Sequence, residues 1–202
     1  MKNLWNSIEA KRFRNDILKM RVYSSRLLGE NRQLVLHGGG NTSVKLMGKN
    51  FFGEEEEFLI VKGSGADLAT IEEKDFSKLS LRKLLKLVEF ENMDDLDLVF
   101  QQNLAMINPD SPSPSIEAIL HAMIPYAWVD HTHADAVLTI TNTPSGEDLI
   151  NELYGNRVIK IPYVKPGFKL AREVFKLKKD LDWKKFDGMI LLNHGIFTFG
   201  ET

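Results

Sequence analysis

The sequence predicts one layered α/β domain. Its 202 residues suit one domain of ordinary to large size. Hydrophobic residues make up 43% of the chain and charged residues 27%, which is the composition of a globular protein rather than of a disordered chain. Strand-like and helix-like patterns alternate without an internal repeat, and no linker divides residues 1–202.

The first half of the chain predicts a long helix, a glycine-rich loop, a hairpin and two further helices. Apolar positions recur at helical spacing over residues 7–28, and Gly29 is a stop signal. The acidic run at 54–57 is interpreted as a solvated hairpin edge rather than a metal site. The remaining elements expected here are a loop over 37–43, a strand over 44–47, a turn at 48–50, a strand over 58–62, and helices over 81–88 and 96–107.

The second half predicts more helices and strands in alternation. A loop rich in Pro and Ser opens a helix over 116–123, with Ser113 or Ser115 as its N-cap and Glu117 in its first turn. Since the chain stops just after a strand that follows a candidate functional residue, we expect a helical C-terminal portion beyond Thr202 in the complete protein. The other elements expected are strands over 128–132, 158–161, 188–192 and 196–199, and helices over 134–140, 147–153 and 168–178.

Composition and charge exclude several functional classes. The net charge is −2 and no long basic stripe is present, so we expect no nucleic-acid partner. Cys is absent, which leaves His and carboxylate as the strong metal ligands. No apolar run approaches the ~20 residues of a membrane span, and the N-terminus lacks the apolar core of a signal peptide. We therefore expect a cytoplasmic protein that does not bind membranes.

The pair His131 and His133 is the first candidate for a metal site. If residues 128–132 form a strand, side chains two apart point to the same face, so the two imidazoles can converge. Two neutral imidazoles on a stiff element form half of a transition-metal site. The alternative is a polar pair at a strand end that faces solvent.

Other residues strengthen the metal interpretation. His194 lies at the end of a buried-type strand, beside Gly195, although a histidine in a capped turn would have the same surroundings. Glu117 could instead complement a helix dipole. Three loops of small residues offer backbone N–H groups and hydroxyls to an anion, which suits a phosphate pocket: 40–43, 63–65 and 113–115.

Taken together, these motifs resemble the class II aldolase/adducin family, the zinc-dependent sugar-phosphate aldolases and epimerases. The matching stretches follow the family's order over residues 10–200: 39–43, 62–65, 115–117, 131–133 and 193–195. The amino-acid sequences of these motifs are most similar to those in the aldolase half of bifunctional rhamnulose-1-phosphate aldolase/alcohol dehydrogenase proteins. The resemblance implies a three-layer α/β/α sandwich with a mixed, mostly antiparallel sheet.

The resemblance also implies roles for individual residues. His131, His133 and His194 would bind Zn²⁺, or another divalent transition metal, and Glu117 would be the catalytic acid/base. The reaction would be aldol cleavage or condensation of a (deoxy)ketose 1-phosphate, with rhamnulose 1-phosphate favoured, and the protein would be a homo-oligomer, by analogy a tetramer. The phosphate would contact some of Gly40, Asn41, Ser64, Gly65, Ser113 and Ser115.

Three questions stay open at this point. The tyrosine that in several relatives protonates the aldehyde oxygen does not map onto Tyr126, Tyr154 or Tyr163. His121 shares a helical face with Glu117, so it either tunes Glu117 or, as we prefer, is a buried structural histidine. The alternative functions are a sugar-phosphate 4-epimerase, a thio-sugar-phosphate dehydratase, and a non-catalytic adducin-like scaffold. Epimerases place Asp where Glu117 stands, and scaffolds lose the metal histidines.

Overall fold

A seven-stranded mixed sheet forms the centre of the molecule. The computed structural model describes residues 2–178 and 181–202. The strand order is β3-β2-β1-β4-β7-β6-β5, and only the β5–β6 pair is parallel, so the expected mixed, mostly antiparallel sheet is confirmed. The strands are β1 (Asn41–Lys49), β2 (Glu55–Lys62), β3 (Phe76–Ser80), β4 (Trp128–Thr132), β5 (Val158–Ile161), β6 (Gly188–Leu191) and β7 (Gly195–Gly200).

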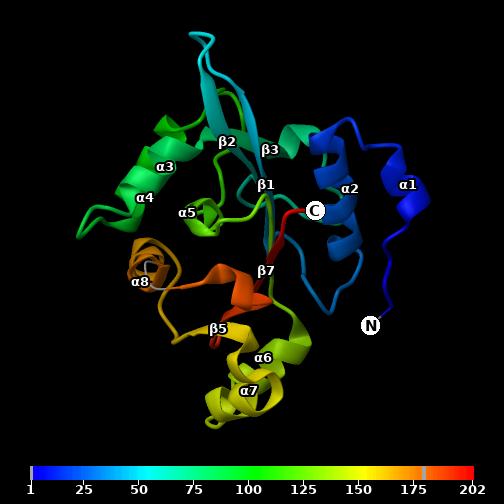
Figure 1. The fold of residues 1–202 in the computed structure, drawn as a ribbon, viewed down its shortest axis with the longest axis vertical. Coiled ribbons are helices and arrows are strands. Elements are labelled where there is room, and N and C mark those ends of the chain that lie inside the picture. The colour runs from blue at the N-terminus through cyan, green and yellow to red at the C-terminus, as the bar shows by residue number, and fades with distance from the viewer. Residues whose placement is uncertain (1, 179–180) are drawn as a thin grey trace.

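Helices cover both faces of this sheet, which gives the three layers that were expected (Figure 1). One face packs against α3 (Leu81–Leu87), α4 (Asp95–Leu104), α5 (Ala118–Met123) and α8 (Phe168–Lys178), with which it forms the largest apolar cluster. The other face packs against α2 (Ile17–Gly29) and, at the opposite end, against α6 (Asp135–Thr141) and α7 (Gly146–Tyr154). The remaining helices are α1 (Ser7–Lys11) and the short 3-10 turns η1 (Glu73–Asp75), η2 (Gly155–Arg157) and η3 (Trp183–Lys185).

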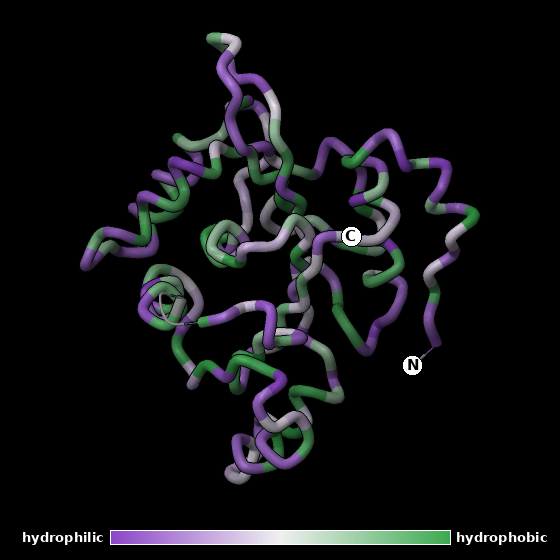
Figure 2. Tube along the Cα trace, viewed as in Figure 1, coloured by the Kyte–Doolittle hydropathy of each residue, from purple (hydrophilic) through white to green (hydrophobic). Residues whose placement is uncertain are grey.

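Helix α5 lies between the sheet and the outer helices. All six of its residues are buried, and it contacts both α3 and α8. Figure 2 shows it as a mostly hydrophobic coil inside a shell of more polar segments. A helix whose side chains are apolar except for one histidine belongs in an interior, so α5 holds its N-terminal end in a fixed place against the sheet. That end carries Glu117.

Several expectations for individual elements were wrong. Residues 41–43, expected in a loop, are the start of β1. The helix expected over 7–28 is two helices, because the Asp16 side chain accepts a hydrogen bond from the Lys19 backbone N–H and starts α2 anew. Strand β3 was not expected; it has only five residues, and its apolar residues Phe76 and Leu79 are three apart, so they do not show the period of two that marks a strand. Glu117 is the N-cap residue of α5 rather than a first-turn residue, so neither Ser113 nor Ser115 caps that helix.

The acidic run 54–57 lies on the β1–β2 hairpin and is mostly exposed, as expected. In the part of the chain that the structure describes, no helix has both the length and the apolar content needed to cross a bilayer.

The antiparallel pairing of the strands has one consequence for function. The start of β1, the end of β2, the end of β4 and the start of β7 all lie at one end of the sheet.

Candidate metal centre and active site

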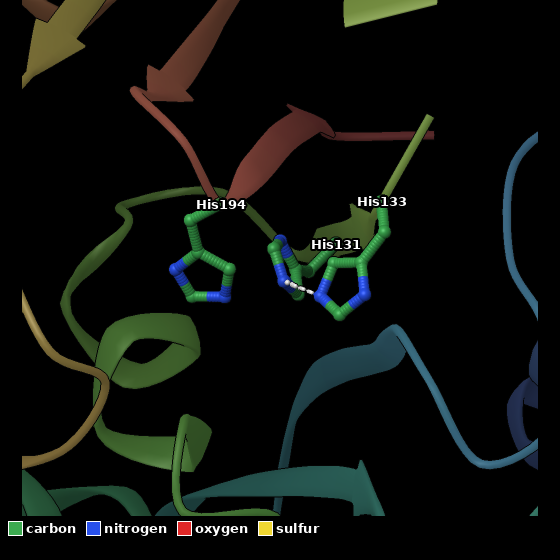
Figure 3. A group of neighbouring side chains, drawn as sticks. All are labelled: His131, His133 and His194. Carbon is green, nitrogen blue, oxygen red and sulfur yellow. Dashed lines mark hydrogen bonds between the residues drawn. The ribbon is translucent and has the colours of Figure 1, made fainter. Parts of the chain in front are cut away.

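Three histidines meet at this end of the sheet (Figure 3). His131 is the fourth residue of β4, His133 follows the strand, and His194 lies in the turn between β6 and β7. One ring nitrogen from each histidine lies within 4.8 Å of the other two. The Nε2 atoms of His131 and His133 are 3.1 Å apart. Strand pairing causes the convergence, because Thr132 of β4 pairs with Ile196 of β7, two residues after His194.

Backbone geometry at the β6–β7 turn holds His194 beside the other two rings. Asn193 has a φ of 58°, in the left-handed region that Asn tolerates better than most residues. Gly195 packs so tightly that a Cβ there would lie 2.5 Å from the Thr132 carbonyl oxygen and 2.9 Å from Cε1 of His131. The turn therefore requires glycine for close approach, and the same contact brings β7 against the histidine pair.

The environment of His131 keeps its Nε2 lone pair available. The ring is fully buried and stacks on Phe197 with a centroid distance of 4.3 Å. Its Nδ1–H donates to the Ile196 carbonyl oxygen at 3.1 Å, which assigns the hydrogen to Nδ1 and leaves Nε2 facing the other histidines. Burial lowers the pKa of His131 to about 4, and burial also lowers the pKa of His133. Both rings are thus neutral near pH 7, as metal ligation requires.

The donor set fits a divalent transition metal. In a tetrahedral zinc site with Zn–N bonds of ~2.0–2.1 Å, ligand nitrogens lie about 3.3 Å apart. The histidine nitrogens here already lie within 4.8 Å of one another, so small ring rotations would suffice. Nδ1 of His194 is buried without a hydrogen-bond partner among the described residues, so no hydrogen bond at that nitrogen opposes a small rotation of the ring. Three imidazoles would leave a metal its full charge and an open coordination position.

Glu117 lies against this triad. Its Oε1 is 3.2 Å from Nε2 of His194, and its Oε2 is 3.5 Å from Nε2 of His131. Asn41 Nδ2 donates to the same Oε2 at 2.7 Å. Burial of the carboxyl group opposes ionisation, but His131, His194 and Asn41 together outweigh it and hold the pKa of Glu117 below its usual range. The carboxylate is therefore ionised, buried and adjacent to the candidate metal ligands.

The three segments of small residues also lie close together, but they differ in how many of their polar groups are hydrogen-bonded within the protein. The Ser64 backbone N–H donates to the Ser113 carbonyl at 2.8 Å, and Gly65 has a φ of +78°. Ser64 and Ser113 are exposed, but the Ser113 hydroxyl donates to Asn103. The side chain of Asn41 is occupied by neighbours within the protein: Glu117, Ser115 and His121.

The loop 38–40 lies beside the loop 63–65. A Cβ on Gly38 would lie 3.0 Å from the Gly65 carbonyl oxygen, and one on Gly40, whose φ is +62°, would lie 2.8 Å from the His131 carbonyl oxygen. The loops therefore pack against each other and against the end of β4. Their contact with a phosphate group stays a prediction.

Sequence reasoning did not single out Lys62 for its structural role. Its side chain is 2% exposed, and its ammonium group donates to the carbonyl oxygens of Gly38, at 3.1 Å, and Ala66, at 2.7 Å. It thus ties the loop before β1 to the loop after β2. Burial lowers its pKa to about 8. The signal available in the sequence was a lysine at the end of an otherwise apolar strand.

The three tyrosines considered for the remaining acid make no hydrogen bond to the triad within the described residues. Tyr126 stacks on Phe199 and donates to the Trp183 carbonyl, so its hydroxyl is used in the apolar core. Tyr154 and Tyr163 are exposed.

Comparison with known proteins finds the same fold in solved structures. The domain of a conserved protein from Thermoplasma acidophilum, described as an N-terminal class II aldolase domain, is 42% identical, with a TM-score of 0.88 over 100% of this chain and 90% of that one. The L-fuculose-1-phosphate aldolase of Thermus thermophilus has a similar fold, with a TM-score of 0.53 and 17% identity over 91% of this chain and 82% of that one.

A longer curated relative also matches. The uncharacterized oxidoreductase YuxG of Bacillus subtilis is 38% identical over 100% of this chain, which spans only 29% of the length of that protein. The family described as the class II aldolase and adducin N-terminal domain matches residues 21–202. The chain therefore belongs to the class II aldolase and adducin N-terminal domain family.

Proposed function

We propose that this domain catalyses the metal-dependent aldol cleavage and condensation of a deoxyketose 1-phosphate, with dihydroxyacetone phosphate and an aldehyde as the other reaction partners. L-Rhamnulose 1-phosphate is the favoured substrate. The observation that carries the proposal is the position of Glu117, whose carboxylate oxygens lie 3.2 Å from His194 and 3.5 Å from His131. A base at that distance from a metal ligand set can reach a carbon acid whose oxygens the metal holds.

Each residue of the site would have its own role in the reaction. Glu117 takes the C3 proton of dihydroxyacetone phosphate in condensation and returns a proton there in cleavage. The hydrogen bond from Asn41 holds the carboxylate in place for that transfer. The backbone N–H groups and hydroxyls of the loops near Gly40, Ser64 and Ser115 receive the phosphate. A bound divalent cation would supply Lewis acidity for the negative charge that develops as the C3–C4 bond breaks.

Zinc is the metal we propose for the triad. The chain has no Cys, and the three converging ligands are all imidazoles, a set that suits zinc in a catalytic site with one position left for substrate. A glutamate at position 117 supports an aldolase, because the epimerases of this family have Asp at the corresponding position. A homo-oligomeric assembly and a cytoplasmic location complete the proposal and rest on the family resemblance.

The solved relatives support the choice of substrate class. Proteins with the same fold are named L-fuculose-1-phosphate aldolases, which act on a deoxyketose 1-phosphate. The oxidoreductase name of the Bacillus relative describes a protein of which this chain spans 29%, so that name does not assign an activity to this domain.

The test is an assay of the complete protein loaded with zinc. L-Rhamnulose 1-phosphate and L-fuculose 1-phosphate are supplied in turn, and released dihydroxyacetone phosphate is measured. We expect product from at least the first substrate and its loss in a chelated sample. Zinc-loaded protein that releases no dihydroxyacetone phosphate from either sugar would refute the proposal. Protein that binds no metal would favour a scaffold.

Glu117→Gln and Glu57→Gln form a matched pair for the acid/base role. Both exchange a carboxylate for an amide of the same shape, but Glu57 is exposed on the β1–β2 hairpin. We expect the first variant to lower kcat by ~10²–10⁴-fold, the usual contribution of general acid–base catalysis. The second variant should match the wild type. Equal activity in the two variants would remove Glu117 from the mechanism.

A further inference from the structure

A chain of buried hydrogen bonds links His121 to Glu117 through Asn41. His121 Nδ1 lies 2.7 Å from the Ser43 hydroxyl, and its Nε2 is hydrogen-bonded to Oδ1 of Asn41. Asn41 Nδ2 is hydrogen-bonded to Oε2 of Glu117 at 2.7 Å and to the Ser115 hydroxyl at 3.2 Å. All five side chains are buried, with His121 and Ser43 at 0% exposure.

The direction of each hydrogen bond follows from the carboxylate at the end of the chain. An ionised carboxylate only accepts hydrogen bonds, so the Asn41 group that faces Glu117 must be the NH₂ end. The Asn41 carbonyl oxygen then faces His121 and requires a donor, which makes Nε2 the protonated ring nitrogen. Nδ1 is left as an acceptor, and the Ser43 hydroxyl must donate to it.

The surroundings of His121 favour the neutral ring. The imidazole packs edge-on against Phe197 at a centroid distance of 5.3 Å. Within the described residues, no carboxylate lies within ion-pair distance of it. Burial lowers the pKa of His121 well below its usual value. A neutral imidazole is the one ionisation state of this side chain that can donate on one side and accept on the other.

We propose that His121 is a positioning residue for the active site: as the Nε2–H tautomer it locks the Asn41 amide with its NH₂ end toward Glu117. The proposal rests on the proposed function, since it assigns a purpose to the orientation of the Glu117 carboxylate. Of the two roles left open for His121, tuning of Glu117 or a purely structural one, the proposal favours the first. The reason is that the His121 ring is hydrogen-bonded to Asn41, which in turn is hydrogen-bonded to Glu117.

The alternative is a histidine that only fills space beneath the sheet. Such a residue would pack equally well as an apolar side chain of similar size, without the cost of burying polar groups. Here the ring pairs with Asn41 and Ser43 on β1, and the atoms that they use have no other hydrogen-bond partner among the described residues. Without His121, the Asn41 amide could rotate and turn its oxygen toward the carboxylate, where two acceptors would repel each other.

His121→Gln and His121→Met test this role in the zinc-loaded complete protein. The two side chains have equal length, but Gln can still donate to Asn41 and Met cannot. We expect His121→Met to lower kcat by ~10–100-fold, because the Asn41 amide would no longer keep its hydrogen bond to the charged Glu117 carboxylate, while KM changes little. His121→Gln should recover most of kcat. A folded His121→Met variant with wild-type kcat would overturn the proposal.

Nitrogen NMR supplies a readout that does not depend on activity. In the wild type we expect the His121 ring to show Nε2 protonated and Nδ1 unprotonated, and the Asn41 side-chain NH₂ to be protected from exchange. In His121→Met that protection should be lost. A ring protonated at Nδ1, or an Asn41 amide that stays protected without His121, would contradict the assignment. Should the wild type lack aldolase activity, the proposed function fails while this measurement still decides the hydrogen-bond chain.

Ser43→Ala covers the case in which His121→Met does not fold. This variant removes one hydroxyl and leaves the ring in place. We expect the ring to begin to populate the Nδ1–H tautomer and kcat to fall by less than in His121→Met. A ring that shifts to the Nδ1–H tautomer while kcat stays at the wild-type value would overturn the proposal, because the Asn41 amide would then not depend on His121 for its orientation. A ring that stays Nε2-protonated with unchanged kcat would agree with it.

Discussion

Gly195→Ala should abolish tight metal binding without removing any ligand. Added to Gly195, a methyl group would lie 2.5 Å from the Thr132 carbonyl oxygen, 2.9 Å from Cε1 of His131 and 3.1 Å from Cδ2 of His133. Ordinary contact begins at 3.4 Å, so the backbone contact alone must open by ~0.9 Å. Metal–ligand distances tolerate only about ±0.2 Å. The strands that carry the triad must therefore separate by more than the site allows.

The expected result is a zinc affinity at least about a hundredfold weaker, which corresponds to ~2.8 kcal/mol. Isothermal titration of metal-free protein with Zn²⁺, or competition with a chelator, measures this directly. Gly200→Ala is the control, because Gly200 lies at the other end of β7 and its nearest neighbour would be the Thr202 carbonyl oxygen at 3.6 Å. Zinc binding by Gly195→Ala within about threefold of the wild type would refute the geometric reasoning.

Three further predictions concern stability. Zinc at a hundred times its Kd should stabilise the fold by ~2.7 kcal/mol and raise the melting temperature. A melting temperature that zinc does not change, or changes equally in His194→Ala, would contradict metal binding by the three histidines. Burial lowers the pKa of Lys62 below its unfolded value, so the buried charge costs stability below about pH 8, and this cost fades as the pH rises toward 10.5. By chemical denaturation, the stability of Lys62→Met relative to the wild type should therefore be up to ~3 kcal/mol more favourable below pH 8 than above pH 10.5, beside a pH-independent loss of the hydrogen bonds to Gly38 and Ala66. A stability difference that does not change with pH would contradict the prediction. Arg21 is 1% exposed and forms an ion pair with Asp130 at 2.8 Å. Arg21→Met should lower the free energy of unfolding by ~3–5 kcal/mol, and adding Asp130→Asn should recover much of that loss. Equal losses in the single and the double variant would show that the ion pair is not the cause.

For several elements with a clear apolar face, the local pattern of the sequence predicted the bounds correctly. Strand β4, strand β5 and helix α8 have the bounds that the sequence predicted. Each has an apolar face and clear flanking signals, such as Pro125 before β4. Strand β3 was missed because its five residues are stabilised by pairing with β2, a partner at a distance that a local window does not include.

The same distinction applies to the candidate site. His131 and His133 are two residues apart on a strand, so their convergence follows from the period of the backbone. Glu117 and Asn41 are 76 positions apart, and their 2.7 Å hydrogen bond depends on where α5 packs against β1. The carbonyl partners of Lys62 come from the loops on either side of it, Gly38 and Ala66, and only the packing of those loops places them at its ammonium group.

The sequence by itself determined the residue types of the site, the spacing of the histidine pair and the family to which the chain belongs. Only the tertiary structure decided how these residues meet. Antiparallel pairing of β4 with β1 and β7 brings Asn41 and His194 to the end of β4, and the buried helix α5 presents Glu117 to them. The physical reason is that strand order and helix packing are set by long-range burial of apolar surface, whereas periodicity reports only which face of each element will be buried.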